Sequence, residues 1–546
     1  MKLKTLLFGA LVGVAFVACT NDNEPAGVTP VKGDNEVAAV DGYMSLKFAM
    51  PGDNAATRAE GWSNEDGFLA ADADEIAVSG ATILFFDGDV QVADPFTTSE
   101  YNSGWSAGQG SIDMEHEAII VLKNAVKNPT SIVAILNTLP EGVTVSRSTT
   151  MPQLLALAGD FRKADAKNFV MTNSVYLDAN KKVQIGAPVT DANVQKTEAL
   201  AKQNPVTIYV EKVVAKAKLA KGNDTTTGVT TKAGKTITVA VNGWWLDNTN
   251  SKSFLVKNLA TSYTELGDWA GWNDATNFRS YWATPAAGTL EHTEYKDAVA
   301  DTKPIYALEN TDQANPTQLC VAATLTVDGA TAGTSIVKYL SEVYTAPDFE
   351  TLLYGMISEK YSTRTGGAGT EADPYTYDSV KKNAFKFEYK TNTADEEGNV
   401  TNIQFDDKDI KDYEAVVSMT YTGTDALYTT DGTTYTEVPK ATYDADFASL
   451  SRKVQYWDGG ATYYFTPIVH NLDVLDADKN PLYGIIRNHL YDITIKSITG
   501  LGTPVANTKS GKEIIPDIPV DEETYLAAEV KILKYKVVKN EVDLGK

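Results

Sequence analysis

Few residues in this chain could do metal chemistry. There are only four His and two Cys, so no His/Cys zinc site is expected. Residues 476–480 read Asp-Ala-Asp-Lys-Asn, like the opening of a calcium loop. However, Pro481 replaces the Gly that such a loop requires, and Arg487 stands where the bidentate Glu belongs. We therefore interpret this segment as a hairpin turn without a metal ion.

Catalytic constellations are equally weak. His116 lies between two Glu, but on a strand it faces away from both neighbours, and His292 in the Glu-His-Thr-Glu run has no further partner in sequence. Residues 366–369 are Gly-rich but are not followed by Lys-Ser/Thr, so they are no phosphate loop. No Ser/His/Asp or Cys/His set has local support. We expect no cofactor and no enzyme activity.

Tryptophans offer a different chemistry, because exposed aromatic rings stack on sugars. Trp244, Trp245, Trp269, Trp272 and Trp282 cluster within about forty residues. The adjacent Trp244 and Trp245 should point to opposite faces of a strand, so at most one can lie in the core of a two-layer sandwich. Glycan binding by this cluster is therefore an alternative hypothesis, and core and interface packing is the other interpretation.

The N-terminus indicates export. Lys2 and Lys4 precede an apolar stretch over residues 6–18, which is too short to span a membrane as a helix. Phe-Val-Ala-Cys at residues 16–19 resembles a bacterial lipobox, which predicts a lipoprotein signal peptide over 1–19 and acylation, with palmitate among the lipids, at Cys19. The precursor would then be anchored in the outer membrane. An ordinary secretory signal with an incidental Cys19 is the alternative.

Composition sets the class of protein. The 546 residues are 43% apolar, enough for two or more cored domains. The net charge of -24 opposes binding to nucleic acid. With Cys19 at the signal peptide, Cys320 is the other thiol, and we expect it to be a small buried apolar residue.

The hydrophobic pattern indicates a mostly β protein. Residues 43–50 alternate cleanly, with Met44, Leu46, Phe48 and Met50 on one face of a half-buried strand. Many further short strand-like runs follow, separated by Gly, Asn and Asp turns. Short helices are expected only over 151–158 and 192–202. This pattern favours β-sandwiches.

The last segment is a second long strand-former. Residues 515–520 contain two prolines and should be extended and stiff. Beyond them lies an alternating apolar face, and after a one-residue phase shift, typical of a bulge, the alternation resumes. The residues of this expected donor strand are Leu526, Ala528, Val530 and Ile532, then Leu533, Tyr535 and Val537.

Four features together resemble the fimbrillin family, the stalk subunits of type V pili on Bacteroides-type bacteria. They are the lipobox with Cys19, the strand 43–50 followed by Asn-Ala-Ala-Thr-Arg-Ala at 54–59, the motifs at 463–470 and 484–493, and the terminal strand. The similarity is strongest in the last hundred residues. His470 and His489 lie within these late motifs, and we interpret them as packing or hydrogen-bonding residues.

The resemblance implies two tandem transthyretin-like β-sandwich domains, few short helices, a C-terminal donor strand and no enzyme activity. It also implies cleavage between Arg58 and Ala59 by an Arg-specific protease. The predicted organisation is a signal peptide at 1–19, a propeptide at 20–58, an N-terminal domain at 59–210, a C-terminal domain at 211–515, and a linker with donor strand at 516–546.

A polymerisation mechanism follows from these parts. Once the chain is cut, the strand bearing Met44, Leu46, Phe48 and Met50 can leave, and an apolar groove opens along a sheet edge. The terminal strand of another copy can fill this groove by donor-strand complementation, in a head-to-tail contact that builds a filament. Expected partners are copies of the chain and pilus anchor and tip subunits, in surface fimbriae that support adhesion or biofilm formation. A pilus tip or adhesin subunit is an alternative, as is a terminal strand that stays at an edge of its own molecule.

Overall fold

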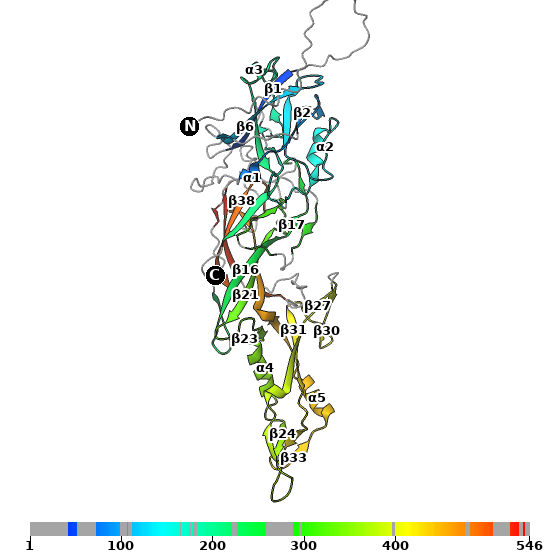
Figure 1. The fold of residues 1–546 in the computed structure, drawn as a ribbon, viewed down its shortest axis with the longest axis vertical. Helices are drawn as coiled ribbons and strands as arrows, with labels where there is room; N and C mark the ends of the chain where they lie inside the picture. Colours follow the sequence, from blue (N-terminus) through cyan, green and yellow to red (C-terminus); the bar gives the residue numbers. More distant parts are fainter. Residues whose placement is uncertain are drawn as a thin grey trace, which may run out of the picture. The chain divides into compact units, whose positions relative to one another are not determined.

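The computed structural model describes residues 42–51, 73–98, 106–107, 112–163, 165–174, 176–177, 183–220, 226–257, 288–293, 298–300, 302–395, 399–475, 481–505, 525–533 and 539–540. They are mostly strands with few short helices, which confirms the predicted β class (Figure 1). The transthyretin-like assignment and the domain boundaries stay predictions. Over the described residues, no helix has the length and apolarity needed to cross a bilayer.

The first sheet is built from strands between residues 42 and 212. Ile83 and Phe85 lie in one apolar cluster, whereas the alternating Leu84 and Phe86 lie in another on the opposite face. Because both faces are covered, the central strands read as continuous apolar runs. In spatial order the strands are β3 (Val90–Gln91), β2 (Ala81–Asp87), β7 (Ser131–Leu136), β9 (Met171–Asn173), β13 (Val206–Lys212), β1 (Gly42–Pro51), β6 (Ile112–Leu122) and β5 (Ser106–Ala107), with β12 (Ala187–Pro188) on β7 and β4 (Phe96–Thr98) on β2.

Two five-stranded sheets follow and share one core. Ile493 and Ile495 of one sheet lie in the same apolar cluster as Val239 and Leu325 of the other, as expected for a sandwich. The first of these sheets orders as β20 (Ile305–Ala307), β14 (Ala215–Ala220), β38 (Leu490–Thr499), β40 (Tyr525–Leu533) and β41 (Lys539–Asn540), and the second as β15 (Thr226–Thr230), β16 (Thr236–Asp247), β21 (Gln318–Val327), β35 (Ala461–Pro467) and β39 (Thr503–Pro504).

Between β21 and β35 the chain makes two further sheets of its own (Figure 1). Two apolar clusters, around Phe349 and around Phe447, hold them together with two helices. The sheets order as β23 (Glu342–Thr345), β22 (Ile336–Tyr339), β34 (Arg452–Trp457), β31 (Glu414–Tyr421), β26 (Phe385–Lys390), and as β25 (Thr376–Ser379), β24 (Ser362–Gly366), β32 (Leu427–Thr430), β33 (Tyr435–Glu437), with α4 (Ala346–Gly355) and α5 (Lys440–Ala448).

Three of the helices begin at a capping threonine, namely Thr150, Thr197 and Thr345. α2 (Met151–Ala156) has a capping box, in which Thr150 accepts from Gln153 N and Gln153 Oε1 accepts from Thr150 N. The helix expected over 192–202 is shorter than predicted, because it divides into η1 (Asp191–Asn193) and α3 (Glu198–Ala201). α1 (Ala73–Ile76) is a single turn.

The remaining elements are short, and they form two-stranded ribbons and 3₁₀ turns. They are β10 (Tyr176–Leu177) with β11 (Val183–Gln184), β17 (Thr249–Asn250) with β19 (Leu290–Glu291), β18 (Ser253–Phe254) with β8 (Ala158–Gly159), β27 (Thr393–Ala394) with β28 (Val400–Thr401), β29 (Gln404–Phe405) with β30 (Lys408–Asp409), β36 (Val469–Leu475) with β37 (Pro481–Tyr483), η6 (Lys382–Ala384) and η7 (Asp458–Gly460). β36 and β37 pair antiparallel, and the turn predicted at residues 476–480 between them lies outside the described residues.

Candidate assembly interface

Strand β1 is paired on both of its sides. Residues Gly42–Pro51 run antiparallel to β6, while residues 46–49 run parallel to β13 (Figure 1). Leu46, for example, lies opposite Ala118 on one side and Val206 on the other. The predicted position at a sheet edge is therefore wrong. Removing β1 would leave backbone N–H and C=O groups of two strands, rather than one, without partners.

The side chains of β1 are deeply buried. Met44, Leu46 and Phe48 are 0%, 0% and 1% exposed and belong to the core cluster of the first sheet. At roughly 1.5–3 kcal/mol for each fully buried side chain, they contribute about 5–9 kcal/mol to holding the strand. These three side chains thus share one buried face of the strand, as their alternation predicted, and the displacement of the strand stays a prediction. The side chain of Met50 lies outside the described residues.

The second face of β1 is covered near its start. Ser45 is buried, and Tyr43 exchanges two backbone hydrogen bonds with Gln195, at 2.7 and 2.9 Å, in the segment that leads into α3. A Cβ on Gly42 would come within 2.7 Å of the Val194 side chain. These hydrogen bonds extend the backbone pairing of β1 on the side opposite β6, beyond the residues that pair with β13.

The terminal strand β40 lies on β38 of its own chain. Leu526, Ala528, Val530 and Ile532 are in register with Ile498, Ile495, Ile493 and Tyr491, four buried residues of β38. On its other side, β40 pairs with β41 only at Val530 and Lys531. The terminal strand is thus fully paired along one side and only briefly along the other.

The register shift in this pair differs from the predicted one. The extra residue lies in β38, between Ile495 and Ser497, opposite Ala527 and Ala528. Strand β40 ends at Leu533, where the sequence predicted a bulge. Tyr535 and Val537 lie outside the described residues, as do Cys19, Arg58 and Ala59.

The late motif at 484–493 ties the first sheet to the sandwich. Asn488 Oδ1 accepts from Lys212 N at 3.1 Å, and Asn488 N donates to Val214 O at 2.9 Å. Arg487 is fully buried and donates to Glu309 Oε2 at 2.8 Å, to Ser253 Oγ at 2.9 Å and to Phe254 O at 2.7 Å. A buried guanidinium needs such complete pairing, because a lost partner leaves an uncompensated charge.

A second buried ionic cluster begins at α1, the first described element after residue 58. Glu75 is 2% exposed and contacts Lys212 at 3.3 Å, Lys216, and Tyr306 Oη at 2.5 Å. Burial alone would raise the pKa of Glu75, but the two ammonium groups and the Tyr306 hydroxyl outweigh it and lower this pKa to about 2. The sequence analysis missed this cluster. Its signal was two Lys within the apolar run that spans β13 and β14.

The histidines and Cys320 have structural surroundings. His470 Nδ1 lies 2.9 Å from Tyr491 Oη, and His489 Nδ1 donates to Arg487 O at 2.7 Å, so both have the packing and hydrogen-bonding surroundings that the sequence suggested. Cys320 is buried, as expected, and burial raises the pKa of its thiol. His292 lies 3.2 Å from Asp247 on the surface. The side chain of His116 is outside the described residues.

Both members of the tryptophan pair are buried. Trp244 is 0% exposed and Trp245 is 2% exposed, and they lie in two different clusters. The prediction that at most one belongs to a core is wrong, because β16 is covered on both faces at this point. These two rings are therefore closed to sugars. Trp269, Trp272 and Trp282 lie outside the described residues.

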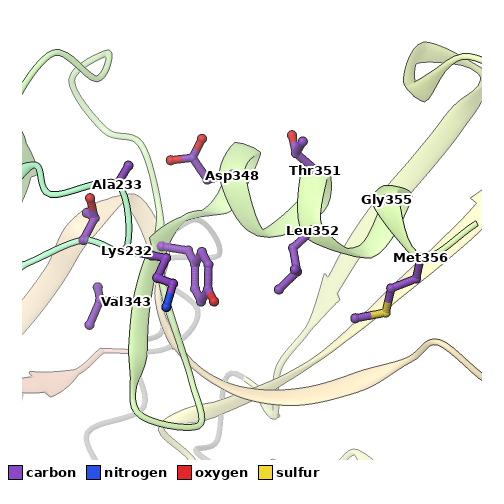
Figure 2. Close-up of a pocket in the computed structure, with 10 residues that line it drawn as sticks. Lys232, Ala233, Val343, Asp348, Thr351, Leu352, Gly355 and Met356 are labelled. Carbon is purple, nitrogen blue, oxygen red and sulfur yellow. The ribbon is translucent and has the colours of Figure 1, made fainter. Parts of the chain in front are cut away.

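A surface groove of about 540 Å³ lies between α4, strand β23 and residues 231–233 (Figure 2). Its charged residues already have partners. Lys232 pairs with Glu342, a hydrogen bond that raises the pKa of Lys232, while Asp348 accepts from Thr345 Oγ1 at 2.8 Å in the cap of α4. The groove lining therefore offers no acid–base pair for catalysis.

Comparison with known proteins agrees with this geometry. Residues 455–541 match the family model described as "Major fimbrial subunit protein type IV, Fimbrillin, C-terminal". Over these residues the chain is similar to the C-terminal region of fimbrillins, which confirms the resemblance drawn from the sequence for this part of the chain. That region holds the late motif and the terminal strand.

Solved structures similar to this chain share little sequence with it. A "putative cell adhesion protein" of Parabacteroides distasonis is 13% identical, covers 91% of this chain and 98% of its own, and has a TM-score of 0.39. The tip fimbrial protein Mfa3 of Porphyromonas gingivalis, with a C-terminal truncation, is 12% identical, covers 91% and 100%, and has a TM-score of 0.30. No curated relative matches the chain.

Proposed function

We propose that this chain is the stalk subunit of a cell-surface pilus, which polymerises by donor-strand exchange after cleavage between Arg58 and Ala59. The observation that carries the proposal is the position of β1: a buried strand near the N-terminus, held between β6 and β13. A protease cut at Arg58 would turn this strand into a peptide held only by non-covalent contacts. Its departure would open a slot with apolar walls and two unpaired strand edges.

The terminal strand has the character to fill the slot. It offers about six or seven apolar residues against the three buried side chains described for β1. In its own molecule β40 is fully paired only to β38. Inside the slot of a neighbour it would be paired on both sides, and each additional backbone hydrogen bond contributes about 0.5–1.5 kcal/mol. Because β40 gives up its pairing with β38 when it moves, the larger apolar face of the terminal strand is the term that favours the filament.

The proposal includes the export route and the partners. The precursor is a lipoprotein acylated at Cys19 and anchored in the outer membrane, and an Arg-specific protease matures it into surface fimbriae. Within the fimbria the chain contacts further copies of itself and the pilus anchor and tip subunits. Adhesion or biofilm formation is the resulting role. A tip subunit is the alternative, and it would not need the terminal strand as a donor.

Electron microscopy before and after trypsin-like cleavage tests this function, with Arg58→Ala as the matched control. Filaments should form from the cut wild-type chain, start at Ala59 by N-terminal sequencing, and be absent from the Arg58→Ala chain because β1 stays covalently attached. Equal filaments from the uncut control would contradict the activation step. A mature N-terminus at a residue other than Ala59 would contradict cleavage after Arg58.

A further inference from the structure

The small sheet β25-β24-β32-β33 carries a distinctive outer surface. Its strand register places Arg364 opposite Tyr377 and Ser362 opposite Tyr428, and cross-strand partners share a face of a sheet. Leu427, on the opposite face, is fully buried in the cluster with Phe447 of α5. We define the tyrosine face as the set Arg364, Tyr375, Tyr377, Tyr428 and Tyr435.

Within the tyrosine face, a guanidinium lies on aromatic rings. The Arg364 guanidinium carbon is 3.8 Å from the centroid of Tyr375, 5.1 Å from Tyr428 and 6.0 Å from Tyr377. Its Nη2 donates to Tyr428 Oη at 2.8 Å. No carboxylate of the described part of the chain forms an ion pair with it. Because stacking uses the flat face of the group, N–H donors at its edge remain for a ligand.

Two of the four rings of the tyrosine face are open to solvent, whereas Tyr428 is buried. Tyr375 is 43% exposed and Tyr435 is 37% exposed. Tyr377 stacks on one side of Tyr435, with centroids 3.9 Å apart and an angle of 6° between the rings. The stack leaves the other side of the Tyr435 ring free to contact a flat apolar surface such as the C–H face of a sugar.

The loop that carries Tyr375 is fixed before any ligand binds. Ala368 N donates to Asp373 Oδ2 at 2.9 Å, and Asp373 N donates to Thr370 O at 3.1 Å. Gly369 has a φ of +73°, and a Cβ there would lie 2.3 Å from the Tyr375 ring. The glycine thus lets the ring lie directly on the loop backbone. A preformed surface loses little conformational entropy on binding.

We propose that the tyrosine face binds an acidic sugar, with Arg364 holding the sugar carboxylate and Tyr435 stacking on the sugar ring. Arg364 has no ion-pair partner among the described residues, so an anionic ligand can pair with it. The two parallel N–H donors of a guanidinium match the two oxygens of a carboxylate. A single guanidinium on a chain of net charge -24 selects one carboxylate rather than a polyanion. The carboxylate of Glu437, 3.5 Å from Tyr428 Oη, can accept from sugar hydroxyls.

The test is saturation-transfer NMR on the full, uncut chain with sialyllactose and with lactose, the neutral probe. The assay needs no filament, so its result is independent of the proposed assembly. Sialyllactose should bind at least tenfold more tightly than lactose, and Arg364→Lys should weaken it at least tenfold. Arg147→Lys, at a partly exposed arginine in the turn between β7 and α2, is the matched control and should bind like wild type.

A second pair of variants separates binding from folding. Tyr435→Ala should weaken sialyllactose binding at least fivefold, whereas Tyr435→Phe should keep it, because the ring rather than the hydroxyl makes the contact. Thermal unfolding of each variant shows that the chain is folded. Equal affinity for both sugars, no transfer to either sugar, or wild-type binding by folded Arg364→Lys or Tyr435→Ala would overturn the proposal.

Discussion

The two end strands of the described chain, β1 and β40, are held in opposite ways. β1 is paired along both sides and buries Met44, Leu46 and Phe48 almost completely. β40 is paired along one side with β38 and meets β41 at only two residues. The strand that the proposal displaces is therefore the more fully paired, and the strand that it uses as the donor is the less fully paired.

In the proposed mechanism, this difference gives the cut after Arg58 a physical purpose. While β1 is covalently attached, its effective concentration at its own slot is so high that no other strand can compete with it. After the cut, β1 competes as a free peptide against a longer strand tethered to a neighbouring subunit. On this proposal, the tight fit of β1 would keep the precursor from assembling early, and cleavage would end that effect.

Removing the terminal strand should have the largest effect. Deletion of residues 525–546 leaves no donor, so the cleaved protein should remain monomeric by sedimentation and by electron microscopy. Deletion of residues 541–546 alone leaves β40 and β41 intact and serves as the control, for which filaments are expected. Filaments of normal length from the larger deletion would favour the tip or edge-strand alternatives.

A cavity in β1 should destabilise the uncut precursor but not the mature protein. Phe48→Ala removes a buried ring and should lower the free energy of unfolding of the uncut chain by about 3–5 kcal/mol. Denaturant titration measures this loss. Val121→Ala, at a 37% exposed position on the adjacent β6, should change it by less than about 0.5 kcal/mol. Cut and assembled protein should be insensitive to Phe48→Ala, and equal destabilisation there would show that β1 never leaves.

Low pH should destabilise the part of the chain that remains after the proposed cleavage, because this part contains Glu75. Glu75 has a folded pKa of about 2, below its ordinary value, so its stabilising contribution is present above pH 4.5 and is lost as pH falls toward 2. The contribution is about 3 kcal/mol, from the two-to-three-unit difference in pKa. Unfolding curves from pH 6 to 2 measure it. Glu75→Gln should flatten this pH dependence, and an unchanged slope would contradict the role given to the cluster.

An exposed ion pair should show the smallest effect. Lys232 and Glu342 are 58% and 42% exposed, in contrast to the buried Glu75 cluster. Lys232→Ala should lower the stability only slightly, and the loss should be smaller still in high salt. Thermal unfolding at two salt concentrations measures this. A cost comparable with that of Glu75→Gln would mean that burial does not set the difference between the two sites.

Local patterns predicted the strands but not their neighbours. The alternation of Met44, Leu46 and Phe48 is visible in sequence, and so is the apolar face of residues 526–532, because strand periodicity is a local property. The interior place of β1 depends on pairing with β13, some 160 residues later, which no local pattern encodes. For the same reason, the shared burial of Trp244 and Trp245 on a doubly covered strand was missed.

The tyrosine face and the Glu75 cluster could not be predicted from the sequence, for a physical reason. Arg364 looks like a flexible-loop residue in sequence, and only the register of β24, β25 and β32 brings its tyrosines together. Glu75, Lys212 and Lys216 lie far apart in the chain, and their ion pairs exist only once the first sheet and β14 have met. Residues that gain their meaning from long-range contacts need the fold before they can be interpreted.

Cryo-electron microscopy of filaments grown from the cleaved chain tests the central claim most directly, because side-chain density identifies the strand that lies between β6 and β13. The account predicts that residues of the terminal segment 525–540 of a neighbouring subunit occupy this place, with residues 42–51 gone. Density for residues 42–51 in the slot, with β40 still on β38 of its own subunit, would contradict it.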